Sequence, residues 1–146
     1  MYRRSVGKIT YVSRDLYTVK IEIPLNYKNT NYVGSIFGGS LFAATDPIYM
    51  IQLIQILGND YIVWDKSAKI NYKKPAKSKA FATFEFTENE INKIKSDVSK
   101  SKKIDLIKSL NIVSETGEVF AELEKTMYIC TEEYYRLKNI FQKKTS

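Results

Sequence analysis

The sequence predicts an α+β fold in which one long central helix is wrapped by a curved antiparallel β-sheet. The segment from Ser40 to Leu57 is apolar on nearly every face, which is typical of a buried helix. The segments that follow alternate apolar and polar residues, as strands with one buried face do. A helix that is apolar all round needs cover on several sides, and a curved sheet supplies it. The length favours a single domain over residues 1–146.

Two strands are expected before the central helix. Lys8 to Ser13 and Leu16 to Leu25 flank a turn at Arg14-Asp15, and the second of them alternates apolar with polar residues. A polar loop rich in asparagine follows from Asn26 to Asn31. Loops of this composition often present side chains to a site, and this one leads into the Gly38-Gly39 pair.

The central helix is expected to begin at Ser40 and to stop at Gly58-Asn59. Pro47 lies inside this segment and cannot donate a backbone hydrogen bond, so we expect the helix to bend just after Asp46.

Four more strands and two more helices are expected after the central helix. The strands are predicted at Asp60–Lys73, Lys79–Phe86, Ile104–Ser114 and Glu118–Cys130. Thr87-x-x-Glu90 is a capping-box pattern, which predicts a short helix with Ile91, Ile94 and Val98 on one face. Thr131 to Gln142 predicts a terminal helix.

The residue types exclude several kinds of chemistry. The chain has no histidine, which removes Ser-His-Asp and Cys-His hydrolysis and histidine-ligated metals. The single cysteine, Cys130, lies in an apolar alternating run, so we expect a buried strand residue and not a nucleophile. No internal disulfide is possible and no signal segment follows Met1, so we expect a cytoplasmic protein. Catalysis must rest on a carboxylate, lysine, tyrosine, hydroxyls or backbone N–H groups, with no metal.

The net charge of +7 favours anionic partners: nucleic acid, an anionic membrane, acyl carrier protein or the phosphates of coenzyme A. Part of this charge is expected to be a solvated helix face and connector, formed by Lys93, Lys95, Lys100, Lys102 and Lys103.

The segment from Asn31 to Asp46 carries the strongest indication of function. Gly38 and Gly39 let a ligand approach the backbone closely, and the amides at a helix start point at such a ligand. Asp46 follows Gly39 by seven residues, about two helical turns, so it shares a face with the helix start. The alternative for Asp46 is a helix-bending Asp-Pro step whose carboxylate binds a nearby hydroxyl or amide.

This spacing resembles the hotdog-fold acyl-CoA thioesterases, in particular the PaaI-like branch with His-Gly-Gly, an aspartate seven residues later and an asparagine six residues before the histidine. Asn31, Gly38, Gly39 and Asp46 match, and Phe37 stands at the histidine position. The strand AKINYKKPA is similar to a strand of the same family. With FGG, DP and VWDKS, the whole chain most resembles a subgroup of the DUF4442 type.

The resemblance implies roles for the matching residues. Asp46 would act as base or nucleophile toward the thioester carbon, and the amides of Gly38 and Gly39 would stabilise the oxyanion. Asn31 would hold either the attacking water or its own loop. Asp65 stands where the family often has a Ser or Thr that assists from the partner subunit; its alternative is a surface salt bridge to Lys66 or Lys69.

The resemblance also implies a substrate surface formed by Phe37 and a lysine cluster. This cluster surrounds Pro75 near the expected position of the coenzyme A phosphates and comprises Lys73, Lys74, Lys77 and Lys79. Its alternative is a solvated turn. Nucleic-acid binding is the weaker interpretation, because no recognised motif accompanies the lysines.

We therefore expect a hotdog domain that hydrolyses an acyl-CoA or acyl-carrier-protein thioester, with coenzyme A only as part of the substrate. We expect a homodimer or a dimer of dimers (a homotetramer), with no nucleic-acid or membrane partner. The alternatives are a non-catalytic acyl- or lipid-binding hotdog protein and a basic nucleic-acid-binding module.

Overall fold

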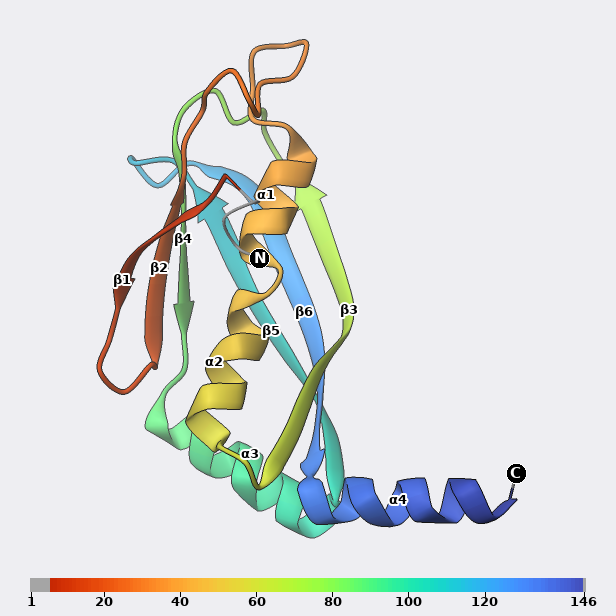
Figure 1. The fold of residues 1–146 in the computed structure, drawn as a ribbon. Helices are drawn as coiled ribbons and strands as arrows, with labels where there is room; N and C mark the ends of the chain where they lie inside the picture. Colours follow the sequence, from red (N-terminus) through yellow and green to blue (C-terminus); the bar gives the residue numbers. More distant parts are fainter. Residues whose placement is uncertain (1–5, 146) are drawn as a thin grey trace.

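The computed structural model describes residues 6–145 and contains a six-stranded antiparallel sheet curved around two consecutive helices (Figure 1). In spatial order the strands are β1 (Lys8–Val12), β2 (Thr18–Ile23), β4 (Ala80–Glu85), β5 (Lys103–Val113), β6 (Val119–Thr131) and β3 (Tyr61–Tyr72). The central helices are α1 (Gly38–Thr45) and α2 (Ile48–Leu57). The predicted α+β hotdog architecture is confirmed.

The central helix differs from its prediction at its start. It begins at Gly38 and not at Ser40, because the carbonyl of Phe37 already accepts hydrogen bonds from the backbone N–H of Ser40 and Leu41. The expected interruption after Asp46 is confirmed, since α1 ends at Thr45 and α2 resumes at Ile48. The segment Gly38–Leu57 is apolar and long enough to span a membrane by composition, and here it is the central helix of the fold.

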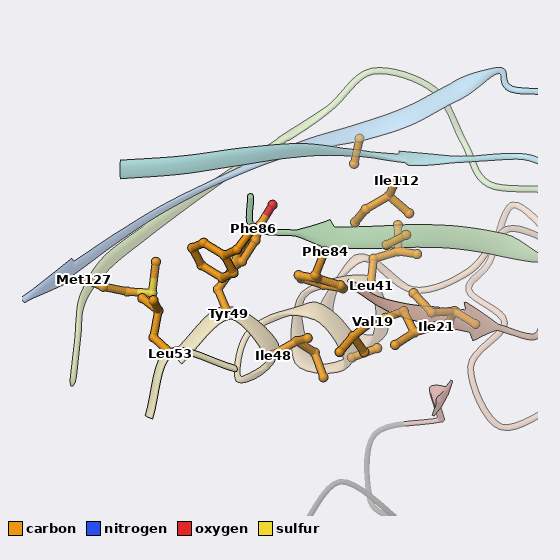
Figure 2. Packing of buried hydrophobic residues seen from close by; sticks show 14 of the residues in the cluster. Val19, Ile21, Leu41, Ile48, Tyr49, Leu53, Phe84, Phe86, Ile112 and Met127 are labelled. Carbon is orange, nitrogen blue, oxygen red and sulfur yellow. The ribbon is translucent and has the colours of Figure 1, made fainter. Parts of the chain in front are cut away.

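The hydrophobic core fills the space between the central helices and the concave face of the sheet (Figure 2). Tyr49 of α2 packs edge-on against Phe84 and Phe86, with ring centroids 4.9 and 5.6 Å apart. Leu53, one turn further along α2, is fully buried. These contacts fix the orientation of the helix over the sheet, and therefore the direction in which Asp46 points.

The capping box predicted for the next helix is confirmed in α3 (Glu88–Ser101). The Thr87 hydroxyl accepts from the backbone N–H of Glu90, and the Glu90 carboxylate accepts from the backbone N–H of Thr87. The predicted apolar face is also confirmed, because Ile91, Ile94 and Val98 are buried.

The outer edge of the sheet beyond β6 is formed by β3, a strand of 12 residues. The terminal helix α4 (Glu132–Thr145) projects away from the body near the start of this strand and buries none of its residues (Figure 1). Trp64 of β3 stacks on Tyr128 of β6 at 4.4 Å and meets Tyr135 of α4 edge-on at 5.8 Å. Cys130 is free and buried, as predicted.

Candidate active site

The start of α1 presents two backbone amides without acceptors. Within residues 6–145, the N–H groups of Gly38 and Gly39 donate no hydrogen bond, and no side chain caps the helix. A Cβ on Gly38 would lie 2.8 to 2.9 Å from ring atoms of Tyr72, and a Cβ on Gly39 would overlap the ring of Phe37. Both positions therefore need glycine as long as the two rings stay in place. The amides are suited to bind a carbonyl oxygen or an anion.

Asp46 caps the other end of α1 and contacts a buried lysine. Its Oδ1 accepts a hydrogen bond of 2.6 Å from Nζ of Lys125, which comes from β6. The Lys125 side chain is 1% exposed, whereas the Asp46 side chain is 40% exposed. The carboxylate of Asp46 is thus held on one side and open to solvent on the other.

Asp65 of β3 contacts the same lysine. Its Oδ1 lies 3.1 Å from Lys125 Nζ, so the two groups form an ion pair. This oxygen is buried and accepts no hydrogen bond of good geometry. Burial raises the pKa of the Asp65 carboxyl above its usual range and the negative charge of Asp46 adds to the rise, while the Lys125 ammonium opposes it. Asp46, Lys125 and Asp65 form what we call the carboxylate–lysine cluster.

The alternative predicted for Asp65, a surface salt bridge to Lys66 or Lys69, is wrong. Lys66 pairs with Asp105 at 2.7 Å, and Asp65 points to the helix side of the sheet. Asp65 faces this side because it alternates with the buried Val63 and is the register partner of the buried Met127.

Lys125 was missed by the sequence analysis, although the strand pattern contains a signal for it. Lys125 alternates with Leu123 and Met127, both fully buried on the helix side of β6. A charged residue on the apolar phase of a strand is costly unless it is paired, which is a reason to search for its partner.

Asn31 supports its own loop. Its Oδ1 accepts hydrogen bonds of 3.0 to 3.1 Å from the backbone N–H groups of Val33 and Ser35 and from the Ser35 hydroxyl. Of the two roles left open for Asn31, holding the loop is therefore the one its carbonyl oxygen performs in the structure.

The lysine cluster around Pro75 is partly neutralised. Lys73 pairs with Glu122 at 3.5 Å, Lys74 with Glu118 at 2.5 Å and Lys79 with Glu22 at 3.6 Å. In the described part of the chain, Lys77 has no carboxylate within ion-pair distance. Lys74 and Lys77 border a hollow of about 280 Å³, and Phe37, at the start of α1, is 59% exposed.

No group of three or more histidine, cysteine, aspartate or glutamate side chains that could hold a metal ion occurs among the described residues.

Comparisons with known proteins agree on the family and the fold. Residues 2–129 match the family described as "domain of unknown function (DUF4442)". No curated protein matches the chain by sequence.

Three solved structures illustrate the similarity of fold. A Pseudomonas aeruginosa protein described as a probable thioesterase is 20% identical, with 89% of this chain and 86% of that chain covered and a TM-score of 0.77. A Haemophilus influenzae thioesterase is 14% identical over 88% and 81%, with a TM-score of 0.60. A mutant form of the phenylacetic acid degradation protein PaaI of Thermus thermophilus is 13% identical over 86% and 95%, with a TM-score of 0.57.

Proposed function

The chain belongs to the DUF4442 family and has the hotdog fold of thioesterases, and on this premise we propose that it hydrolyses an acyl-CoA or acyl-carrier-protein thioester. The observation that supports this proposal most directly is the pairing, on one helix, of two acceptor-free amides with a half-exposed carboxylate. The first group suits a thioester carbonyl oxygen, and the second suits attack at its carbon.

The spacing between the two groups fits a thioester. Gly39 and Asp46 are separated by roughly 10 Å along the helix axis, and the Asp46 side chain leans back toward the helix start, which shortens that separation. An amide hydrogen bond, a C=O bond and an attacking oxygen in contact with the carbon together span roughly 7 Å. One thioester group can therefore contact the amides and the carboxylate at the same time.

In the proposed reaction, Asp46 attacks the thioester carbon itself or takes a proton from a water that attacks it. The electron pair of the C=O bond moves to oxygen, where the amides of Gly38 and Gly39 stabilise the negative charge, a contribution of about 3 kcal/mol per donor. The C–S bond then breaks and the thiolate leaves; where Asp46 acted as base, the thiolate takes the proton from it. With direct attack, water hydrolyses the resulting anhydride and regenerates Asp46.

The substrate and assembly are part of the proposal. The lysine cluster would attract the phosphates of coenzyme A or an acidic acyl carrier protein, with Lys77 the member left without a carboxylate among the ion pairs found. The long outer strand β3, which carries Asp65, suits pairing with a second copy, as a homodimer or dimer of dimers in the cytoplasm.

Replacement of Asp46 tests the proposal. Asp46→Asn keeps the shape of the side chain and removes its charge, so we expect a normally folded protein that loses at least ~100-fold in kcat on acyl-CoA substrates. Asp105→Asn is the matched control, because Asp105 is an ion-paired aspartate of β5 outside the cluster. Wild-type turnover by Asp46→Asn on several acyl-CoAs would remove the catalytic assignment.

A non-catalytic acyl- or lipid-binding protein is the second candidate. It is favoured by Phe37, an apolar ring where the PaaI-like branch has histidine. Stoichiometric acyl ligand in the purified protein, found by mass spectrometry with no turnover of any thioester, would favour this candidate.

A further inference from the structure

The carboxylate–lysine cluster brings together three elements that are distant in the sequence. Asp46 comes from the end of α1, Lys125 from the middle of β6 and Asp65 from the edge strand β3. A lysine that is 1% exposed would lose its hydration without compensation if no anion faced it. The two carboxylates supply that compensation, and the shared ammonium fixes them relative to each other.

We propose that Lys125 is a positioning residue of the thioester site: its ammonium holds Oδ1 of Asp46 and leaves the second oxygen of that carboxylate for the substrate, while Asp65 contacts the same ammonium. This inference rests on the proposed function for its catalytic meaning. The effect of Lys125 on the Asp46 carboxylate is a property of the folded protein and can be tested without substrate.

The geometry restricts what Lys125 can contact. Its neighbours along β6 on the same face, Leu123 and Met127, are fully buried and offer no alternative acceptor. Its register partner on β5 is Lys108, a second lysine on the helix side of the sheet. Lys108 pairs with Glu90 of α3 at 2.9 Å and lies 4.7 Å from the Phe86 ring, so it has its own anion.

The charged groups near Asp46 are Lys125 of β6 and Asp65 of β3, with Lys108 of β5 beside Lys125 in the sheet. Lys125 contacts Asp46 directly, and Asp65 is linked to Asp46 through the ammonium of Lys125. Lys108 and Glu90 form a neighbouring ion pair with no net charge. Two carboxylates share one ammonium in the cluster, so removal of the lysine leaves two like charges close together. Removal of Asp65 leaves the ammonium to Asp46 alone. The two changes must act on Asp46 in opposite directions.

The two variants should shift the titration midpoint of Asp46 in opposite directions, which a purely structural role of Lys125 would not produce. We would follow the carboxyl carbon of Asp46 by NMR from pH 2 to 8, identified by its loss in Asp46→Asn, in the wild type and three variants. In Lys125→Met the titration midpoint should rise, because the ammonium that contacts the carboxylate is gone. In Asp65→Asn it should fall. Lys108→Met, which removes the neighbouring, partly buried lysine, should leave the midpoint within a few tenths of a unit.

The acid limb of kcat against pH for an acyl-CoA should move with the NMR midpoint in each variant. Lys125→Met should lower kcat more than it raises KM, because Asp46 does not contribute uniform binding. The double variant Lys125→Met with Asp65→Asn should recover part of the midpoint shift, since it removes the like charge.

Each outcome decides one of the two claims. An Asp46 midpoint that is unchanged in both Lys125→Met and Asp65→Asn overturns the role of Lys125, whether or not thioesters are hydrolysed. Opposite midpoint shifts with no thioester turnover by the wild type support the control of Asp46 by Lys125 and overturn the proposed function. If Lys125→Met does not fold, the sign of the Asp65→Asn shift decides, because that variant keeps the lysine paired.

Discussion

At the scale of single residues, Glu90 shows how an ion pair couples stability to pH. Burial favours the neutral form of Glu90, but hydrogen bonds from Lys108 and from the backbone N–H of Thr87 outweigh it, so the pKa of this carboxyl lies below its usual range. The unfolded chain then binds the proton at a higher pH than the folded protein does. The stabilisation is therefore present above about pH 4.5 and is lost as the pH falls through the lowered pKa.

We expect Glu90→Gln to weaken the acid dependence of stability below about pH 5. The loss at pH 7 should be at most about 1 kcal/mol, because the Glu90 side chain is 42% exposed and solvent screens the pair. Urea unfolding between pH 3 and 7 measures both quantities. Glu88→Gln, on the same helix, is the control; if both variants change the acid dependence equally, the assignment to Glu90 is wrong.

The lysine cluster gives a second prediction at this scale. Lys73→Ala with Lys74→Ala removes attraction that acts on ground state and transition state alike, so KM for acyl-CoA should rise more than kcat falls. The effect should shrink as salt rises, since exposed charges are screened over ~8–10 Å at physiological ionic strength. Lys93→Ala with Lys95→Ala, on α3, is the matched control. An unchanged KM at low salt would place the phosphates elsewhere.

At the scale of elements, the contribution of the α3 capping box to stability can be tested separately from the candidate site. Thr87→Ala removes the hydroxyl that accepts from the Glu90 amide and should cost about 1 kcal/mol in the free energy of unfolding. Turnover of an acyl-CoA should stay within twofold, because α3 contributes no residue to the candidate site. Urea denaturation and steady-state kinetics measure the two.

Ser96→Ala is the control for this prediction, because Ser96 is exposed in the middle of the same helix. Alanine has the higher helix propensity, so this variant should gain a few tenths of a kcal/mol where Thr87→Ala loses stability. A loss of similar size in both variants would mean that the cap is not the cause.

At the scale of the whole molecule, β3 leaves a long strand edge without a partner among the described strands. An open edge of 12 residues that carries the half-exposed Trp64 and Tyr72 is a surface that a second copy can cover. We expect sedimentation to give a homodimer or homotetramer at micromolar concentration. A stable monomer would contradict this.

A cysteine scan would locate the interface. If two β3 strands pair antiparallel about the strand centre, Ser67→Cys should form a disulfide-linked dimer under mild oxidation, whereas Ser109→Cys on the interior strand β5 should not. The native Cys130 is buried and should not compete. Equal cross-linking of both variants would place the contact away from the β3 edge.

Most of the fold was predictable from the sequence, because the elements are encoded locally. The strand alternation, the Thr87–Glu90 capping box and the Pro47 interruption each act over a few residues, and the structure confirms all three. The exact start of the central helix was not predictable, since it depends on whether the Phe37 carbonyl already accepts the first helical bonds.

In the candidate site, too, the local features were predictable from the sequence and the long-range contacts were not. The sequence by itself determined that Gly38, Gly39 and Asp46 lie on one helix, because helical periodicity fixes which positions share a face. Only the tertiary structure decided that Lys125, 79 positions away, holds Asp46, that Asp65 meets the same ammonium, and that glutamates accompany three of the four cluster lysines. Ion pairs of this kind follow from strand order and from the register between strands, and neither leaves a local pattern that identifies the partner.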